Sequence, residues 1–117
     1  MISAPQPEPQ RPPVPRQCQR YAVDFSLKVF SPGTPGATTG RSGDISVSGL
    51  SFYAPIELTA GQTIQLHFSL PHSQLVFGVR AIVQNANGFR YGVEFTRLNP
   101  HESEEIARVC RILELKR

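Results

Sequence analysis

The chain has 117 residues, a length suited to one domain and too short for two. Its formal net charge of +3, from 12 Lys and Arg against 9 Asp and Glu, is lower than nucleic-acid-binding surfaces usually carry. No secretory signal pattern is present, and no apolar run approaches the roughly 20 residues that a membrane helix needs. We therefore expect a cytoplasmic protein without membrane insertion.

The N-terminal stretch differs in composition from the rest of the chain. Residues 1–15, MISAPQPEPQRPPVP, include six prolines and few side chains that a core could bury. Such a composition favours extended or polyproline II conformations over packed structure. We predict a flexible proline-rich tail over residues 1–15 and one folded domain over residues 16–117.

Beyond the tail, apolar and polar side chains alternate in short runs, the pattern of half-buried strands. The predicted strands cover residues 21–30, 38–47, 50–54, 63–70, 75–84 and 89–95. The sequence Asn85-Ala86-Asn87-Gly88 predicts the turn of a hairpin between the last two. Since closure removes unpaired edges, we predict an all-β fold in which six antiparallel strands form a β-barrel.

One helix is predicted after the strands, near the C-terminus. Asn99 is placed to cap it, Pro100 fits its first turn, and Glu102 completes a capping box. Apolar residues follow at helical spacing and should pack on the barrel: Ile106, Val109, Cys110 and Leu113.

The residues that usually carry catalysis or bind metals are sparse. Cys18 and Cys110 flank the domain and are expected to be reduced thiols, with Cys110 in the core. A redox role remains open for Cys18, which lies between two arginines. The three histidines lack metal-ligand spacing, and no acid–base or nucleophilic combination stands out. We expect neither a metal site nor an enzyme.

Two polar clusters provide the chemistry of a binding site. Arg16 and Arg20 precede the first strand, and arginines can hold phosphates or the O6 and N7 acceptors of guanine. Asp44 can accept hydrogen bonds from the N1–H and N2 donors of guanine. Ser46 can bind phosphate or orient a neighbour, and Gly49 can allow a close approach to the main chain. Together these residue types suit a guanine nucleotide with exposed phosphates.

The same residues resemble the two signature motifs of the PilZ domain family. Those motifs are Arg-x-x-x-Arg before the first strand and Asp/Asn-x-Ser-x-x-Gly between the second and third. They stand here as Arg16-Gln17-Cys18-Gln19-Arg20 and Asp44-Ile45-Ser46-Val47-Ser48-Gly49, followed later by Tyr91-Gly92-Val93-Glu94-Phe95. The resemblance covers roughly residues 16–115. Gln84 departs from it, because many relatives carry an aromatic or basic residue at that place.

The resemblance implies a six-stranded antiparallel barrel with a C-terminal helix that binds cyclic di-GMP. The ligand-binding residues that it implies are Arg16, Arg20, Asp44, Ser46 and Gly49. It implies no cofactor, and a signal passed to a separate downstream effector protein.

Two other functions remain open at this point. One is a protein-interaction adaptor on the same fold that does not bind nucleotide. The other is a small barrel for single-stranded nucleic acid, in which Tyr53, Phe89 and Tyr91 would be the aromatic platforms.

Overall fold

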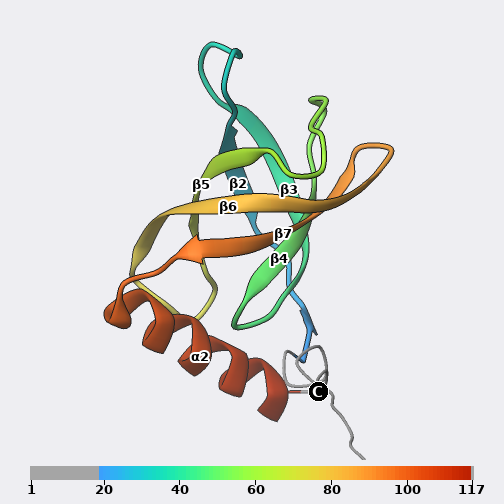
Figure 1. Ribbon diagram of the computed structural model, residues 1–117. Coiled ribbons are helices and arrows are strands. Elements are labelled where there is room, and N and C mark those ends of the chain that lie inside the picture. The colour runs from blue at the N-terminus through green and yellow to red at the C-terminus, as the bar shows by residue number, and fades with distance from the viewer. Residues whose placement is uncertain (1–18, 117) are drawn as a thin grey trace, which may run out of the picture.

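The computed structural model describes residues 19–116, and the predicted tail, Arg16 and Cys18 lie outside this range. Figure 1 shows a strongly curved sheet with one helix across one of its ends. The elements are β1 (Tyr21–Ala22), β2 (Ser26–Phe30), β3 (Thr38–Ile45), β4 (Gly49–Tyr53), β5 (Thr63–Ser69), β6 (Val76–Asn87), β7 (Arg90–Arg97) and α2 (Pro100–Leu115).

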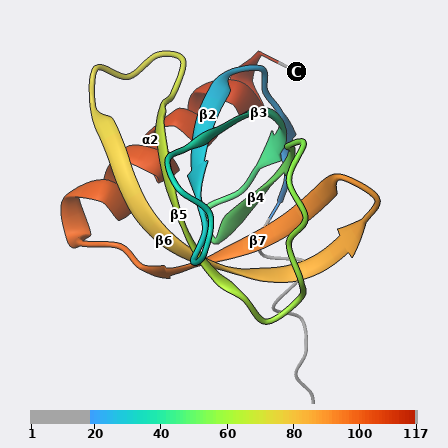
Figure 2. The same cartoon turned by 90° about the horizontal axis from the view of Figure 1, so that it is seen from above.

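The sheet closes on itself into a barrel. Its strands follow the order β1-β3-β2-β5-β6-β7-β4, and the additional pairing of β3 with β4 joins the two ends. All pairings are antiparallel, and the view along the barrel in Figure 2 shows the strands as a ring with α2 behind it. β1 and β2 both pair with β3, so together they make one side of a six-stranded barrel. The predicted fold is confirmed.

The first predicted strand, 21–30, is interrupted between β1 and β2. Residues 23–25 lie opposite only Ser42 and Gly43, because Ala22 pairs with Asp44 and Ser26 with Arg41. The buried Ser42 hydroxyl bridges this irregular step: its Oγ accepts from the Phe25 N–H at 2.9 Å and donates to the Val23 carbonyl at 2.7 Å. A side chain therefore replaces part of the ladder, which the alternating pattern alone does not indicate.

The barrel interior is filled by the apolar face of each strand. In β5, Ile64, Leu66 and Phe68 point inward, as their alternation predicts. The Phe68 ring stacks on Phe77, with ring centres 5.2 Å apart. Tyr91 is also buried, and its hydroxyl donates to the Ile56 carbonyl at 2.7 Å. Tyr91 is therefore not available as an aromatic platform, which the single-stranded nucleic-acid alternative would require.

The hairpin between β6 and β7 is longer than predicted. Asn85, Ala86 and Asn87 pair with residues of β7 instead of forming the turn. The turn consists of Gly88 and Phe89, and Gly88 has a φ of +65°, which favours glycine.

Helix α2 begins with the predicted capping box, formed by Asn99 and Glu102. Its buried face consists of Ile106, Val109 and Cys110. Burial raises the pKa of the Cys110 thiol to about 11, so this cysteine is held as an unreactive thiol of the core, as expected.

Candidate functional site

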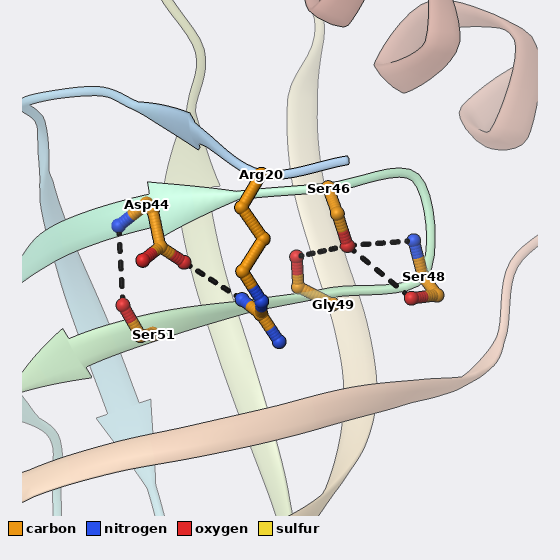
Figure 3. A network of polar contacts seen from close by, with 6 residues as sticks. All are labelled: Arg20, Asp44, Ser46, Ser48, Gly49 and Ser51. Atoms are coloured by element: carbon orange, nitrogen blue, oxygen red, sulfur yellow. Dashed lines mark hydrogen bonds and ion pairs between the residues drawn. The ribbon is translucent and has the colours of Figure 1, made fainter. Parts of the chain in front are cut away.

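The corner between β3 and β4 carries the Asp-x-Ser-x-x-Gly sequence, and Figure 3 shows its polar contacts. The Ser46 side chain is fully buried, and its Oγ accepts from the Ser48 N–H at 3.2 Å. The main chain of Ser46 donates to the Gly49 carbonyl at 2.8 Å. These bonds close a tight turn over residues 46–49, since a serine hydroxyl can replace a main-chain partner two residues on. Ser46 therefore sets the shape of the corner.

Gly49 lies where β4 passes close to β7. A Cβ atom placed on it would lie 2.0 Å from the Val93 carbonyl oxygen and 3.1 Å from the Glu94 Cα. No side chain fits at that distance, so the pairing of Gly49 with Glu94 requires glycine. The close approach that the structure shows at Gly49 is that of the neighbouring strand, and the approach of a ligand to this residue stays a prediction.

Asp44 lies at an irregular step of β3. Ser42 pairs with Phe52 and Asp44 with Ser51, so that Gly43 is an extra residue in β3 relative to β4. Bulges of this kind turn neighbouring side chains to a new direction. The Asp44 N–H donates to the Ser51 Oγ at 3.1 Å, which holds the strand at the bulge. The carboxylate of Asp44 is left on the outer face of the barrel.

Arg20 meets Asp44 there. Its Nη1 donates to the Asp44 Oδ1 at 2.7 Å, in an ion pair whose side chains are 51% and 26% exposed. Figure 3 shows Arg20 reaching across from the segment before β1. The pairing of β1 with the end of β3 sets this geometry, because Ala22 lies opposite Asp44. The two polar clusters of the sequence thus meet in space.

The predicted site residues fall into three groups in the structure. Arg20 and Asp44 form a polar pair that is partly exposed to solvent. Ser46 and Gly49 are buried beneath the surface, where they support the corner. Arg16 lies outside the described residues. Direct contact of any of the five with a ligand stays a prediction.

Two exposed side chains next to this pair have no place in either sequence motif. Tyr53 at the end of β4 is 52% exposed, and the Arg90 guanidinium carbon lies 5.4 Å from the centre of its ring. The pairing of β4 with β7 places Tyr53 opposite Arg90, and no short sequence motif could have indicated this neighbourhood. Gln84, the departure from the family pattern, donates to the Glu94 Oε1 at 3.0 Å.

A shallow apolar hollow of about 420 Å³ lies beside the site, not at it. It is lined by Ser26, Thr39, Gly40, Arg41, Tyr53, Ala54, Pro55 and Phe89. Phe89, like Tyr53, is about half exposed at its edge. Neither Asp44 nor Arg20 is among the lining residues. The hollow is therefore an apolar surface separate from the Arg20–Asp44 ion pair.

Within residues 19–116, no group of three or more His, Cys, Asp or Glu side chains is arranged to hold a metal ion. None of the helices in that range is long and apolar enough to cross a membrane.

Comparison with known proteins assigns the architecture. The family model described as PilZ domain matches residues 15–111. The PilZ domain of CeSA from a cellulose-synthesizing bacterium is 18% identical with a TM-score of 0.63, over 82% of this chain and 98% of that one. The PilZ domain of YcgR from Escherichia coli, solved with c-di-GMP, is 18% identical with a TM-score of 0.67, over 86% and 92%.

The inhibitor of motility MotI/DgrA of Bacillus subtilis is 15% identical with a TM-score of 0.75. The match covers 92% of this chain, which spans about half the length of that protein, 53%. At these identities the likeness is one of fold. No curated protein matches the chain in sequence.

Proposed function

The chain belongs to the PilZ domain family, and on this basis we propose that it is a non-catalytic receptor for cyclic di-GMP. The ligand binds between the Arg16–Arg20 segment and the β3–β4 corner, and the bound state signals to a separate partner protein. One observation carries the proposal: the 2.7 Å ion pair between Arg20 and Asp44, which joins the two family motifs on an accessible face. The YcgR domain with c-di-GMP supports the choice of ligand.

Binding exchanges the partners of this ion pair. In the empty protein Arg20 and Asp44 neutralise each other. The guanine N1–H and N2 donors then take the place of Arg20 on the Asp44 carboxylate, and Arg20 turns to a phosphate. An exposed ion pair is worth only about 0–1 kcal/mol, whereas hydrogen bonds to charged groups contribute about 1.5–3 kcal/mol each. The exchange is therefore favourable.

The buried residues of the motif act indirectly in this mechanism. Ser46 and Gly49 hold the corner and the β4–β7 pairing, and so support the end of β3 that carries Asp44. Arg16 is the first arginine of the Arg-x-x-x-Arg motif, four residues before Arg20. From this position in the motif we expect it to provide a second guanidinium that binds the phosphates.

Isothermal titration calorimetry with cyclic di-GMP tests the proposal. Asp44→Ala and Arg20→Ala should each weaken binding roughly ten- to a hundredfold, the equivalent of one charge-assisted contact. Asp24→Ala is the matched control, because Asp24 also forms an exposed ion pair, with Arg41 at 2.9 Å, and it lies outside both motifs. Its affinity should equal that of the parent. Parent-like binding by both site variants, or no binding by the parent, rejects the proposal.

The second candidate function is a protein-interaction adaptor on the PilZ fold that does not bind nucleotide. The apolar hollow with half-exposed Tyr53 and Phe89 at its edge favours it. Aromatic side chains with accessible faces are common anchors of protein interfaces. Such an adaptor would give no calorimetric signal with cyclic di-GMP, and the same titration separates the two functions.

A further inference from the structure

Asp44 has a second guanidinium close to it, that of Arg90. A Cβ atom placed on Gly43, the neighbour of Asp44 in the bulge, would lie 3.7 Å from the Arg90 Nη2 and 2.9 Å from the Ser51 Oγ. Arg90 therefore reaches back along the outer face of β4 to the bulge. Arg20 comes to Asp44 from the segment before β1, whereas Arg90 comes from β7.

Tyr53 holds the Arg90 side chain in this position. The guanidinium lies over the Tyr53 ring at 5.4 Å, and its Nη1 donates to the Tyr53 hydroxyl at 3.3 Å. Stacking on an aromatic face fixes the plane of a guanidinium and leaves its other donors available. The pKa of Arg90 is raised, chiefly by the hydrogen bond to Tyr53 and to a smaller extent by the charge of Asp44.

The surface under Arg90 is made of small residues. Ser51 pairs with Asp44 on one side and with Gly92 on the other, and Gly43 lies in the adjoining bulge. Large side chains are thus missing at Gly43 and Ser51, whereas the Asn85 side chain lies against Gly92, with its Oδ1 2.9 Å from the Cβ position of that glycine. A ligand seated on Asp44 can therefore reach Arg90 across Gly43, whose Cβ position lies 3.7 Å from the Arg90 Nη2.

We propose that Arg90, stacked on Tyr53, is a further ligand-binding residue of the site and contacts an anionic phosphate of the nucleotide whose guanine lies on Asp44. The inference rests on the proposed function. It gives the ligand a cation on each side of Asp44. It also assigns a role to Tyr53, which supports Arg90 and does not itself carry the charge.

Calorimetric titrations with cyclic di-GMP at several salt concentrations test this role. Arg90→Ala should weaken binding about tenfold or more, and its affinity should fall less steeply with salt, because one phosphate contact is missing. Arg90→Lys keeps the charge and loses the planar stacking, so its affinity for cyclic di-GMP should lie between those of the parent and Arg90→Ala. Tyr53→Phe keeps the ring and should bind within about threefold of the parent, since only the weak hydroxyl bond is lost.

Arg80→Ala is the control, because Arg80 is also exposed but borders a different hollow with Phe30 and Gln65. It should bind like the parent. Thermal melts of the empty Arg90→Ala protein establish that it folds, and Arg90→Lys provides the test if it does not. If Arg90→Ala matches the parent in affinity and salt dependence while Asp44→Ala loses binding, the role of Arg90 is refuted and the proposed function stands. If the parent itself does not bind, both fall.

Discussion

Asp44 and Ser46 lie on the same short stretch of chain but differ in what they can touch. The Asp44 carboxylate is accessible and pairs with Arg20, whereas the Ser46 hydroxyl is fully buried and bonds within the corner. An accessible charge can exchange partners at little cost, while a buried hydroxyl cannot leave its partners unsatisfied. We therefore infer that Asp44 contacts the ligand, whereas Ser46 shapes the corner that follows Asp44 in the chain.

This difference predicts effects of different size for the two alanine variants on stability. Ser46→Ala should lower the free energy of unfolding by about 1–3 kcal/mol, because the Ser48 N–H loses its acceptor. Asp44→Ala should change the free energy of unfolding by less than about 1 kcal/mol, as expected for an ion pair that is partly exposed to solvent. Urea denaturation measures both. A larger loss of stability in Asp44→Ala than in Ser46→Ala would contradict the assignment.

Gly49 provides a second prediction at this scale. Gly49→Ala should destabilise the protein by about 1–3 kcal/mol, because the added methyl group would lie 2.0 Å from the Val93 carbonyl oxygen and β7 must move. Hydrogen exchange of the β4 and β7 amides should increase together. Gly61→Ala is a comparison without a clash, since nothing lies within 4 Å of its Cβ position. Any loss of stability in that variant comes from the positive φ of +94° at residue 61. Parent-like stability of Gly49→Ala would rule out the packing role.

At the scale of elements, a polar cluster fastens helix α2 to the loop between β5 and β6. Arg108 Nη2 donates to the Glu105 Oε2 at 2.8 Å and to the His72 carbonyl at 2.6 Å, and the Ser73 hydroxyl donates to the same Glu105 oxygen. The hydrogen bonds from Arg108 and Ser73 lower the pKa of Glu105 to about 2. This cluster connects the helix to a loop that sequence periodicity leaves unassigned.

The lowered pKa predicts a pH dependence of stability. A carboxyl group whose pKa is lower in the folded state contributes its stabilisation above its unfolded value and loses it as the pH falls. The contribution of Glu105 should be complete above about pH 5 and disappear between its ordinary value of 4.5 and about 2. Glu105→Gln should therefore be less stable than the parent at pH 7, with the difference narrowing toward pH 2. Urea denaturation across this range measures it.

Glu104→Gln is the matched control for this prediction. Glu104 precedes Glu105 on the same helix and its side chain is exposed. Its substitution should leave the pH profile of the parent unchanged. A constant difference between Glu105→Gln and the parent from pH 7 to pH 2 would show that the cluster does not depend on the charge of Glu105.

At the scale of the whole molecule, the closed barrel determines how binding can be detected. β1 and the β3–β4 corner belong to the same hydrogen-bonded ring as the core strands, so a ligand across them stabilises the whole fold. Cyclic di-GMP at 100 times its dissociation constant should add about 2.7 kcal/mol of stability. For a domain of this size the melting temperature should rise on the order of 10 °C.

A thermal-shift titration of the full chain checks this rise. Asp44→Ala at the same ligand concentration should shift by much less. A nucleotide-independent adaptor would show no shift in either protein. The single-stranded nucleic-acid alternative is weakened on structural grounds, since Tyr91, one of its three expected platforms, is in the core.

The sequence by itself determined which faces of β2 and β5 point inward, where α2 begins, and which residues form the two family motifs. These features are local: alternation, capping and short motifs depend on neighbours in the chain. The tertiary structure decided the interruption of the first predicted strand at residues 23–25, opposite Ser42, the need for glycine at 49, and the meeting of Arg20 and Arg90 around Asp44. These features depend on the register between strands that are distant in sequence. The alternation of apolar and polar residues indicates which face of a strand is buried, but it does not indicate which residue of another strand lies opposite.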